Sequence, residues 1–154
     1  MGAAVPDPRR ATRADVPALS ALWTALLRDH ADIDTALALT GSSGAALEAR
    51  IRDPRADPRT RIWTAGGGAE TIGFCAAHVG AAPASLAETG RVSITELFVR
   101  DSGRRSGFGR ALAVAAFAWA KERGAERIEV RVAVRNAAGQ GFWRSLGFGD
   151  FVDV

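Results

Sequence analysis

Residues 91–109 read RVSITELFVRDSGRRSGFG, and no other stretch of the chain says as much about the fold. The first half, Arg91–Val99, is rich in β-branched and aromatic residues and predicts a strand. The second half is a turn of glycine and arginine, followed by an alanine-rich segment with helical spacing. Glycines allow backbone N–H groups to converge, and a helix N-terminus adds partial positive charge. The stretch therefore predicts a strand, a cradle for a phosphate group and a helix, in that order.

The turn differs from two well-known phosphate-binding loops. It has neither the Gly-Lys-Ser/Thr of a Walker A loop nor a GxGxxG fingerprint. Its arginines would supply charge-assisted donors to an anion. A stretch of this composition also occurs simply as a turn, so both interpretations stay open at this point. The candidate anion-binding residues are Arg104, Arg105, Ser106, Gly107, Phe108, Gly109 and Arg110.

Glu96 lies in the middle of the predicted strand. Strict alternation along a strand places its side chain on the face of Ile94 and Phe98. A carboxylate among apolar neighbours can act as a general base. The other interpretation is a carboxylate at the strand edge that faces water or pairs with an arginine.

Further elements follow from periodicity and turn residues. Thr12 and Asp15 have the spacing of a capping box, and Pro17 suits a first helical turn. The predicted strands are 9–11, 61–65, 71–79, 91–99, 127–134 and 148–154. The predicted helices run from Pro17 to about 28–31, through Leu47 and Ile51, from Phe108 to the stop at Gly124, and over 137–146. The C-terminal half thus alternates strand, turn and helix.

Composition narrows the class of protein. The 154 residues fit one domain, which we place at 9–154 after a tail at 1–8. The pI is near 10.3 but the formal charge is only +3, because the chain has no Tyr and a single Lys. Nucleic-acid binding is therefore a remote alternative. Cys75 is the only cysteine, which excludes an intramolecular disulfide and a Cys-rich zinc site. With no signal peptide or membrane span in the sequence, we expect a cytoplasmic protein.

A third motif completes a familiar pattern. Asn136 is followed by AAGQGFWRSLGF, which ends at Phe148. Asn136 is suited to cap the helix that follows while its amide stays free for a ligand. Together with Glu96-Leu97-Phe98-Val99 and the Arg-x-x-Gly-x-Gly turn, this motif closely resembles the GNAT superfamily of acyl-CoA-dependent N-acetyltransferases, in a subgroup with Phe-Trp near the end. The resemblance is specific over 91–148 and looser over 9–79.

The resemblance implies a coenzyme site. The backbone of Leu97, Phe98 and Val99 would pair with the pantetheine arm where the strands 91–99 and 127–134 splay apart. The pyrophosphate would lie on the amides of 104–109, Asn136 would contact the arm, and Phe142 and Trp143 would line its acyl end, although Phe142 is also a candidate for the core. Glu96 matches a position that family members use as general base, directly or through water.

Trp143 departs from the family pattern, which usually has Tyr there as a proton donor to the leaving thiolate. An indole N–H donates a hydrogen bond but is no acid at working pH. No other Tyr exists in the chain to replace it. A thiol has a pKa near ~8.5, so its thiolate leaves readily without an acid. Ser145, Cys75 or water are the alternative donors.

The acceptor site is less marked. In this family the first two helices and their connection line it, which makes Trp23, His30 and Asp34 candidates. Each has a structural alternative: Trp23 as core, His30 as a helix-end residue and Asp34 as a solvated carboxylate.

We therefore expect one α/β GNAT-like domain with a mixed, mostly antiparallel, V-shaped central sheet and about four helices. The expected reaction is direct transfer of an acetyl group from acetyl-CoA to a primary amine of a small molecule or peptide, without a metal. The alternative is a non-catalytic acyl-CoA-binding module. The short last strand also predicts a homodimer.

Overall fold

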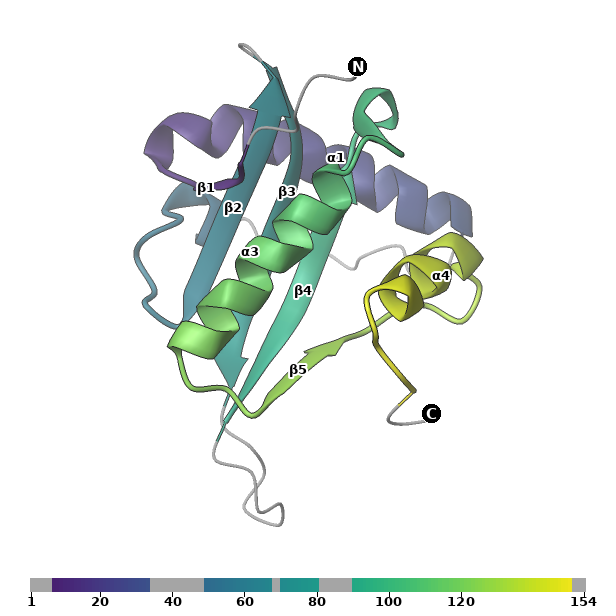
Figure 1. Ribbon diagram of the computed structural model, residues 1–154. Coiled ribbons are helices and arrows are strands. Elements are labelled where there is room, and N and C mark those ends of the chain that lie inside the picture. The colour runs from purple at the N-terminus through teal and green to yellow at the C-terminus, as the bar shows by residue number, and fades with distance from the viewer. Residues whose placement is uncertain (1–6, 34–48, 68–69, 81–89, 151–154) are drawn as a thin grey trace.

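A five-stranded sheet forms the centre of the fold. The computed structural model describes residues 7–33, 49–67, 70–80 and 90–150. Its strands run in the order β1-β2-β3-β4-β5, antiparallel except for the parallel pair β4 and β5 (Figure 1). They are β1 (Arg9–Arg10), β2 (Thr60–Gly67), β3 (Glu70–Gly80), β4 (Arg91–Val99) and β5 (Arg127–Val130).

Helices cover both faces of the sheet. α3 (Phe108–Glu122) crosses one face and α1 (Val16–Ile33) lies behind the other, while α4 (Ala137–Ser145) lies beside the open end of the sheet (Figure 1). Residues 49–52 are also helical, and 3-10 turns occupy Arg13–Asp15 and Asp101–Gly103. The predicted mixed α/β fold is therefore confirmed.

Two hydrophobic clusters hold these layers together. The first, the α3 cluster, joins α3 and α4 to the sheet and includes the edge-to-face pair Trp63 and Trp119, whose ring centroids lie 5.6 Å apart. The second, the α1 cluster, joins α1 to the other face through Leu19, Leu22 and Phe74. Each cluster lies between helix and sheet, as expected of a sheet covered on both faces.

The N-terminus of α1 confirms the predicted capping box. Asp15 is 6% exposed and accepts the backbone N–H of Thr12 at 2.8 Å. Both of its oxygens also bind the guanidinium of Arg9, at 2.8 and 2.6 Å. These bonds, with the one from Arg9 the largest, hold the pKa of the Asp15 carboxyl below its usual value.

β5 is shorter than predicted, and the strand pairing shows why. It pairs with β4 only from Arg91↔Arg127 to Ile94↔Val130, and then the two strands diverge (Figure 1). A turn closes at Asn136, whose N–H donates to the carbonyl of Ala133. The alternation through Val134 was therefore misleading, since Val134 is 86% exposed. β4 continues without this neighbour to Val99.

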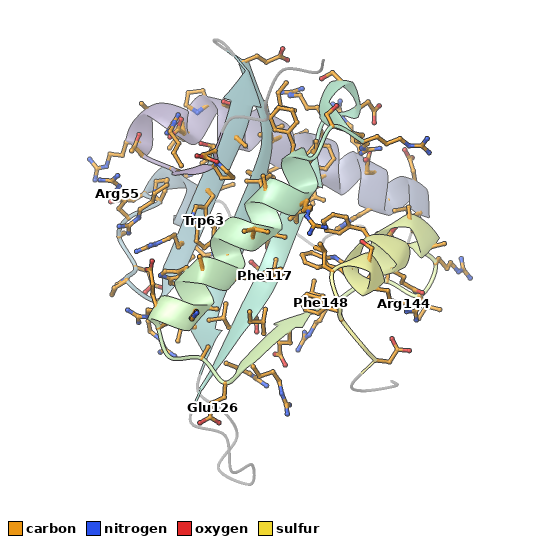
Figure 2. The ribbon with its side chains drawn as sticks, in the orientation of Figure 1. Arg55, Trp63, Phe117, Glu126, Arg144 and Phe148 are labelled. Carbon is orange, nitrogen blue, oxygen red and sulfur yellow. The ribbon has the colours of Figure 1, made fainter. Side chains whose placement is uncertain are left out.

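The predicted last strand is absent over 148–150, and 151–154 lie outside the described residues. Gly147, with φ of 95°, ends α4, and the N–H of Phe148 donates to the carbonyl of Trp143. Figure 2 shows Phe148 beside Phe117 of α3, with ring centroids 5.8 Å apart. The homodimer inferred from that strand stays a prediction. No helix within the described ranges is long and apolar enough to cross a membrane.

Candidate functional site

The turn before α3 presents a row of backbone donors. Arg105 and Gly107 both have positive φ, 60° and 87°, which turns neighbouring amides toward one side. The first backbone bond of the helix is donated by Ala111 to the carbonyl of Gly107. Among the turn and loop hydrogen bonds of the described residues, none is donated by the backbone N–H groups of 105–110. This is the geometry of an anion site at a helix N-terminus.

The arginines of the turn divide into two kinds. Arg104 is held by the protein: its guanidinium donates to Asp29 at 2.6 Å and to the carbonyl of Val99 at 3.0 Å, and it pairs with Asp101 at 2.8 Å. Arg105 and Arg110 are exposed and have no ion pair with any described residue. The sequence grouped all three as anion ligands; in the structure Arg104 has partners within the protein, whereas Arg105 and Arg110 have no ion pair with a described residue.

The divergence of β4 and β5 leaves an open backbone edge beside this turn. Leu97, Phe98 and Val99 pair with β3 on one side and have no strand partner among the described residues on the other. Gly109 lies where β4, α3 and α4 meet, because a Cβ there would lie 3.4 Å from Phe142 and 3.8 Å from Leu97. The structure thus brings the predicted coenzyme residues of β4 and the turn into one place.

α4 contributes the remaining predicted coenzyme residues. Asn136 caps the helix, since its Oδ1 accepts the N–H of Gly139 at 2.9 Å. Its Nδ2 has no bond to a described residue, so the predicted cap with a free amide is confirmed. Trp143 is buried between Phe142 and Phe148, at centroid distances of 4.9 and 5.2 Å. Its place in the core explains an aromatic residue there independently of any ligand.

Glu96 faces the α1 side of the sheet, because a β-bulge interrupts the alternation of β4. Ala76 pairs with Glu96 but Ala77 pairs with Ile94, which leaves Thr95 as the extra residue. Ile94 accordingly packs in the α3 cluster, and Phe98 packs in the α1 cluster. The prediction that Glu96 shares a face with Ile94 was wrong, whereas the shared face with Phe98 is confirmed.

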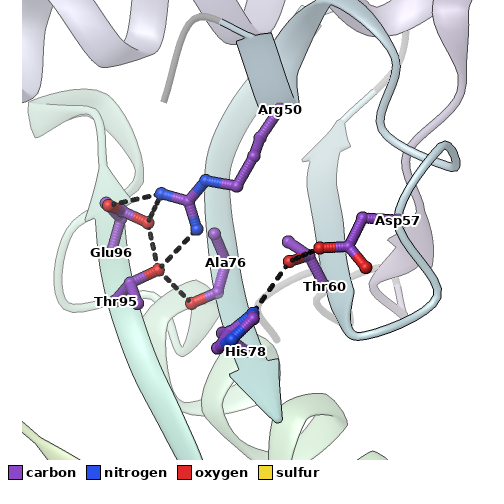
Figure 3. Close-up of polar contacts among 7 residues, drawn as sticks. All are labelled: Arg50, Asp57, Thr60, Ala76, His78, Thr95 and Glu96. Atoms are coloured by element: carbon purple, nitrogen blue, oxygen red, sulfur yellow. Dashed lines mark hydrogen bonds and ion pairs between the residues drawn. The ribbon is translucent and has the colours of Figure 1, made fainter. Parts of the chain in front are cut away.

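The carboxylate of Glu96 already has partners. Nη2 of Arg50 lies 3.2 Å from Oε1 and 3.5 Å from Oε2, and Thr95 Oγ1 donates to Oε2 (Figure 3). The hydroxyl of Thr95 also lies 3.2 Å from the carbonyl oxygen of Ala76. The arginine pairing considered for Glu96 is thus observed. No sequence signal marked Arg50 as the partner, since it lies 46 residues away.

A pocket of about 560 Å³ opens on the same face of the sheet. It reaches from the start of β2 across β3 and β4 to β5. Arg50 and Thr95 line it, but Glu96 behind them does not. The other lining residues are Asp57, Thr60, His78, Arg91, Ser93, Ile94, Glu129, Val130 and Arg131.

One wall of this pocket holds a chain of three polar side chains. Thr60 Oγ1 donates to Asp57 Oδ2 at 3.1 Å and lies 3.1 Å from Nδ1 of His78 (Figure 3). The backbone N–H of Arg59, above all, holds the pKa of the Asp57 carboxyl below its usual value. The sequence does not predict these hydrogen bonds, because the three residues come from two strands and a loop and form no local motif.

The predicted acceptor residues are not brought to this pocket. Trp23 packs half-buried against the α1 cluster, as its structural alternative proposed. His30 lies in the last turn of α1 and does not line the pocket, and Asp34 falls outside the described residues.

Two alternative proton donors to the thiolate can also be placed. Cys75 is fully buried in the α3 cluster, and burial raises the pKa of its thiol, so it is a poor acid. Ser145 Oγ is exposed and donates to the carbonyl of Phe142 at 2.6 Å.

Residues 23–148 match the model of the acetyltransferase (GNAT) family. The chain belongs to this family. The turn at 105–110 and the open edge of β4 both lie within the matched residues. No curated protein sequence is similar enough to the chain to count as a match.

Solved structures share the fold at low sequence identity. A tetramutant of the BH1408 protein from Bacillus halodurans is 19% identical, with a TM-score of 0.83 over 97% of both chains. AAC(6')-Iy, in complex with the bisubstrate analog CoA-S-monomethyl-acetylneamine, is 19% identical, with a TM-score of 0.77 over 96% of this chain and 93% of the other. The aminoglycoside 6'-N-acetyltransferase AAC(6')-IG from Acinetobacter haemolyticus is 20% identical, with a TM-score of 0.76 over 97% of this chain and 94% of the other.

Among the described residues of our chain, no three His, Cys, Asp or Glu side chains gather as a metal site.

Proposed function

We propose that this GNAT acetyltransferase moves an acetyl group from acetyl-CoA directly to a primary amine of a small molecule. The observation that carries the proposal is the turn at 105–110, whose amides lie at the N-terminus of α3 beside the open edge of β4. A pyrophosphate fits these amides, and an amide-containing arm fits the edge as an added strand. AAC(6')-Iy, which shares the fold, is described in complexes with CoA and with a CoA bisubstrate analog.

Both main-chain and side-chain groups contribute to the proposed coenzyme site. We assign the pyrophosphate to the amides of 105–110, with Arg105 and Arg110 as the cations that approach it. Arg104 holds β4, the turn and α1 together and lies outside this set. Asn136 Nδ2 is free to donate to the arm, and Phe142 lines it near Gly109.

The acceptor enters from the other face of the sheet, through the pocket over β3, β4 and β5. Its lining carries three arginines and two carboxylates, Asp57 and Glu129. Some similar structures are named as aminoglycoside acetyltransferases. A lining with more cations than anions favours an acceptor of low net charge over a polycation. We therefore propose a small amine that also carries hydroxyl or acidic groups.

Glu96 lies between this pocket and the open edge of β4, which is where the amine and the thioester would meet. We propose that it receives a proton from the acceptor nitrogen through a water molecule, since Arg50 and Thr95 separate it from the pocket. With no Tyr in the chain, the thiolate would leave without a phenol donor.

Two measurements test the function. Acetyl-CoA should raise the melting temperature by mass action, and no shift at near-millimolar ligand would refute the coenzyme site. Release of free thiol from acetyl-CoA in a panel of small amines should then identify an acceptor. Binding without thiol release from any amine would instead favour the non-catalytic module.

A further inference from the structure

We propose that His78 is a second proton acceptor for acetyl transfer, and that its Nε2 is the basic atom facing the acceptor. The inference rests on the proposed function and adds a residue that neither the sequence pattern nor the family match assigns. It follows from the chain Asp57, Thr60 and His78, whose last member lines the pocket (Figure 3).

The hydrogen bonds of Thr60 select the tautomer of the imidazole. A hydroxyl has one proton, and an ionised carboxylate only accepts. Because Asp57 takes the proton of Thr60 Oγ1 at 3.1 Å, that oxygen can only accept from Nδ1 of His78, also at 3.1 Å. Nδ1 therefore carries the hydrogen of the neutral ring, and Nε2 keeps its lone pair.

The surroundings leave Nε2 available. Thr60 is buried, so its hydroxyl is held in place at the start of β2. His78 is half-buried and lines the pocket, and no described residue donates to its Nε2. The carboxylate of Asp57, one hydroxyl away, would stabilise the imidazolium once it forms.

His78 lies within reach of the place where the amine would react. Ala76 pairs with Glu96, and His78 is two residues further along the same face of β3. With a rise of about 3.3 Å per residue and strands about 4.8 Å apart, the Cα atoms of His78 and Glu96 lie roughly 8 Å apart. A small amine spans that separation. Glu96 is engaged by Arg50, which makes His78 the less encumbered base of the two.

The acceptor nitrogen loses two protons in the reaction, and each of the two bases accepts one of them. An acceptor that arrives as R–NH3⁺ must first lose a proton, which passes to Nε2 of His78. The nitrogen lone pair then bonds to the acetyl carbon, the carbon–sulfur bond breaks, and sulfur leaves with the electron pair. The second nitrogen proton passes through Glu96 and water to the thiolate, and the imidazolium returns its proton to solvent. The products are the amide, the thiol and one proton.

The tautomer can be read without any activity. The chain has two histidines, so long-range ¹H–¹⁵N spectra contain two imidazoles, and His78→Asn assigns them. We expect the Nδ1–H tautomer for His78 in the wild type and in Thr60→Ser, and loss of this preference in Thr60→Val. An Nε2–H tautomer in the wild type would overturn the inference.

Kinetics test the catalytic role with an amine that the wild type acetylates. His78→Asn keeps an N–H donor near Nδ1 and removes Nε2. We expect kcat to fall about 10²-fold or more while the acceptor KM changes little. Thr60→Val should lower kcat less, and Thr60→Ser should restore it.

The possible failures are distinguishable. An active wild type with unchanged kcat in His78→Asn would overturn the role of His78 and leave the proposed function intact. If His78→Asn fails to fold, the Thr60 pair decides, and equal kcat in the Ser and Val variants would refute the inference. A wild type that releases no thiol with any amine refutes the proposed function and the inference together.

Discussion

Arg104→Gln tests whether the first arginine of the Gly/Arg turn binds the coenzyme or holds the fold. The substitution removes a guanidinium that contacts Asp29, Asp101 and the carbonyl of Val99. We expect it to lower thermal stability and to leave acetyl-CoA affinity within about twofold, because those contacts occupy the side chain. Its matched partner is Arg105→Gln, which removes an exposed guanidinium with no ion pair to a described residue.

The size of the stability loss follows from the contacts. The side chains of Arg104 and Asp29 are 47% and 44% exposed, so each ion pair contributes about 0–1 kcal/mol after screening. The bond to the Val99 carbonyl contributes about 0.5–1.5 kcal/mol. The contact over the ring of Phe98, at 5.7 Å, contributes about 0.5–1 kcal/mol. The total is about 1–4.5 kcal/mol, or roughly 2–18 °C in melting temperature for a domain of this size.

Thermal unfolding and calorimetric titration with acetyl-CoA distinguish the two roles. Arg105→Gln should keep the melting temperature and weaken acetyl-CoA binding about tenfold, the effect of one charge-assisted bond. The reasoning is refuted if Arg104→Gln weakens binding tenfold at an unchanged melting temperature.

Three further changes test the fold. Gly103→Ala should destabilise the protein by about 1–3 kcal/mol, because its Cβ would overlap Cγ2 of Ile72; urea unfolding measures this, and Gly90→Ala, with open space around its Cβ, is the control. Asp15→Asn should cost about 1–3 kcal/mol at pH 7, since it replaces the ion pair with Arg9 by a neutral amide; because the folded pKa is lowered, this contribution should begin to decline below about pH 4 and be lost as pH falls through the folded pKa, and an equal difference at pH 3 and 7 would contradict it. Cys75 should resist iodoacetamide in the folded protein, as mass spectrometry would show. Because its folded pKa is raised, stability should also fall by about 1.4 kcal/mol per pH unit above roughly pH 8.5, and Cys75→Ala should lack this slope.

Local signals predicted most of the fold. The capping box of Thr12 and Asp15, the β2–β3 hairpin and the turn before α3 depend on residues close in sequence, so spacing alone found them. The end of β5 was predicted too late because its alternation continues after β4 has diverged. Pairing between strands, which sequence spacing does not reveal, decides where that strand stops.

The same difference between local and distant residues applies to the candidate site. The amide cradle is one continuous turn and was predicted from its glycines and arginines. The ion pair of Arg50 and Glu96 and the bond between Thr60 and His78 join residues 46 and 18 positions apart. No local pattern encodes such pairs. The bond between Arg104 and Asp29 likewise joins residues 75 positions apart, and no local pattern predicts it.

The bulge at Thr95 reverses the alternation of side chains between the two faces of β4. Before it, the even-numbered residues Val92 and Ile94 pack in the α3 cluster, and after it the even-numbered Phe98 packs in the α1 cluster. Regular alternation through Thr95, without the bulge, would instead direct the carboxylate of Glu96 into the apolar layer under α3. The bulged conformation of this one residue therefore keeps a charged group out of the core without any change in the strand's composition, and redesign of β4 must treat its two segments separately.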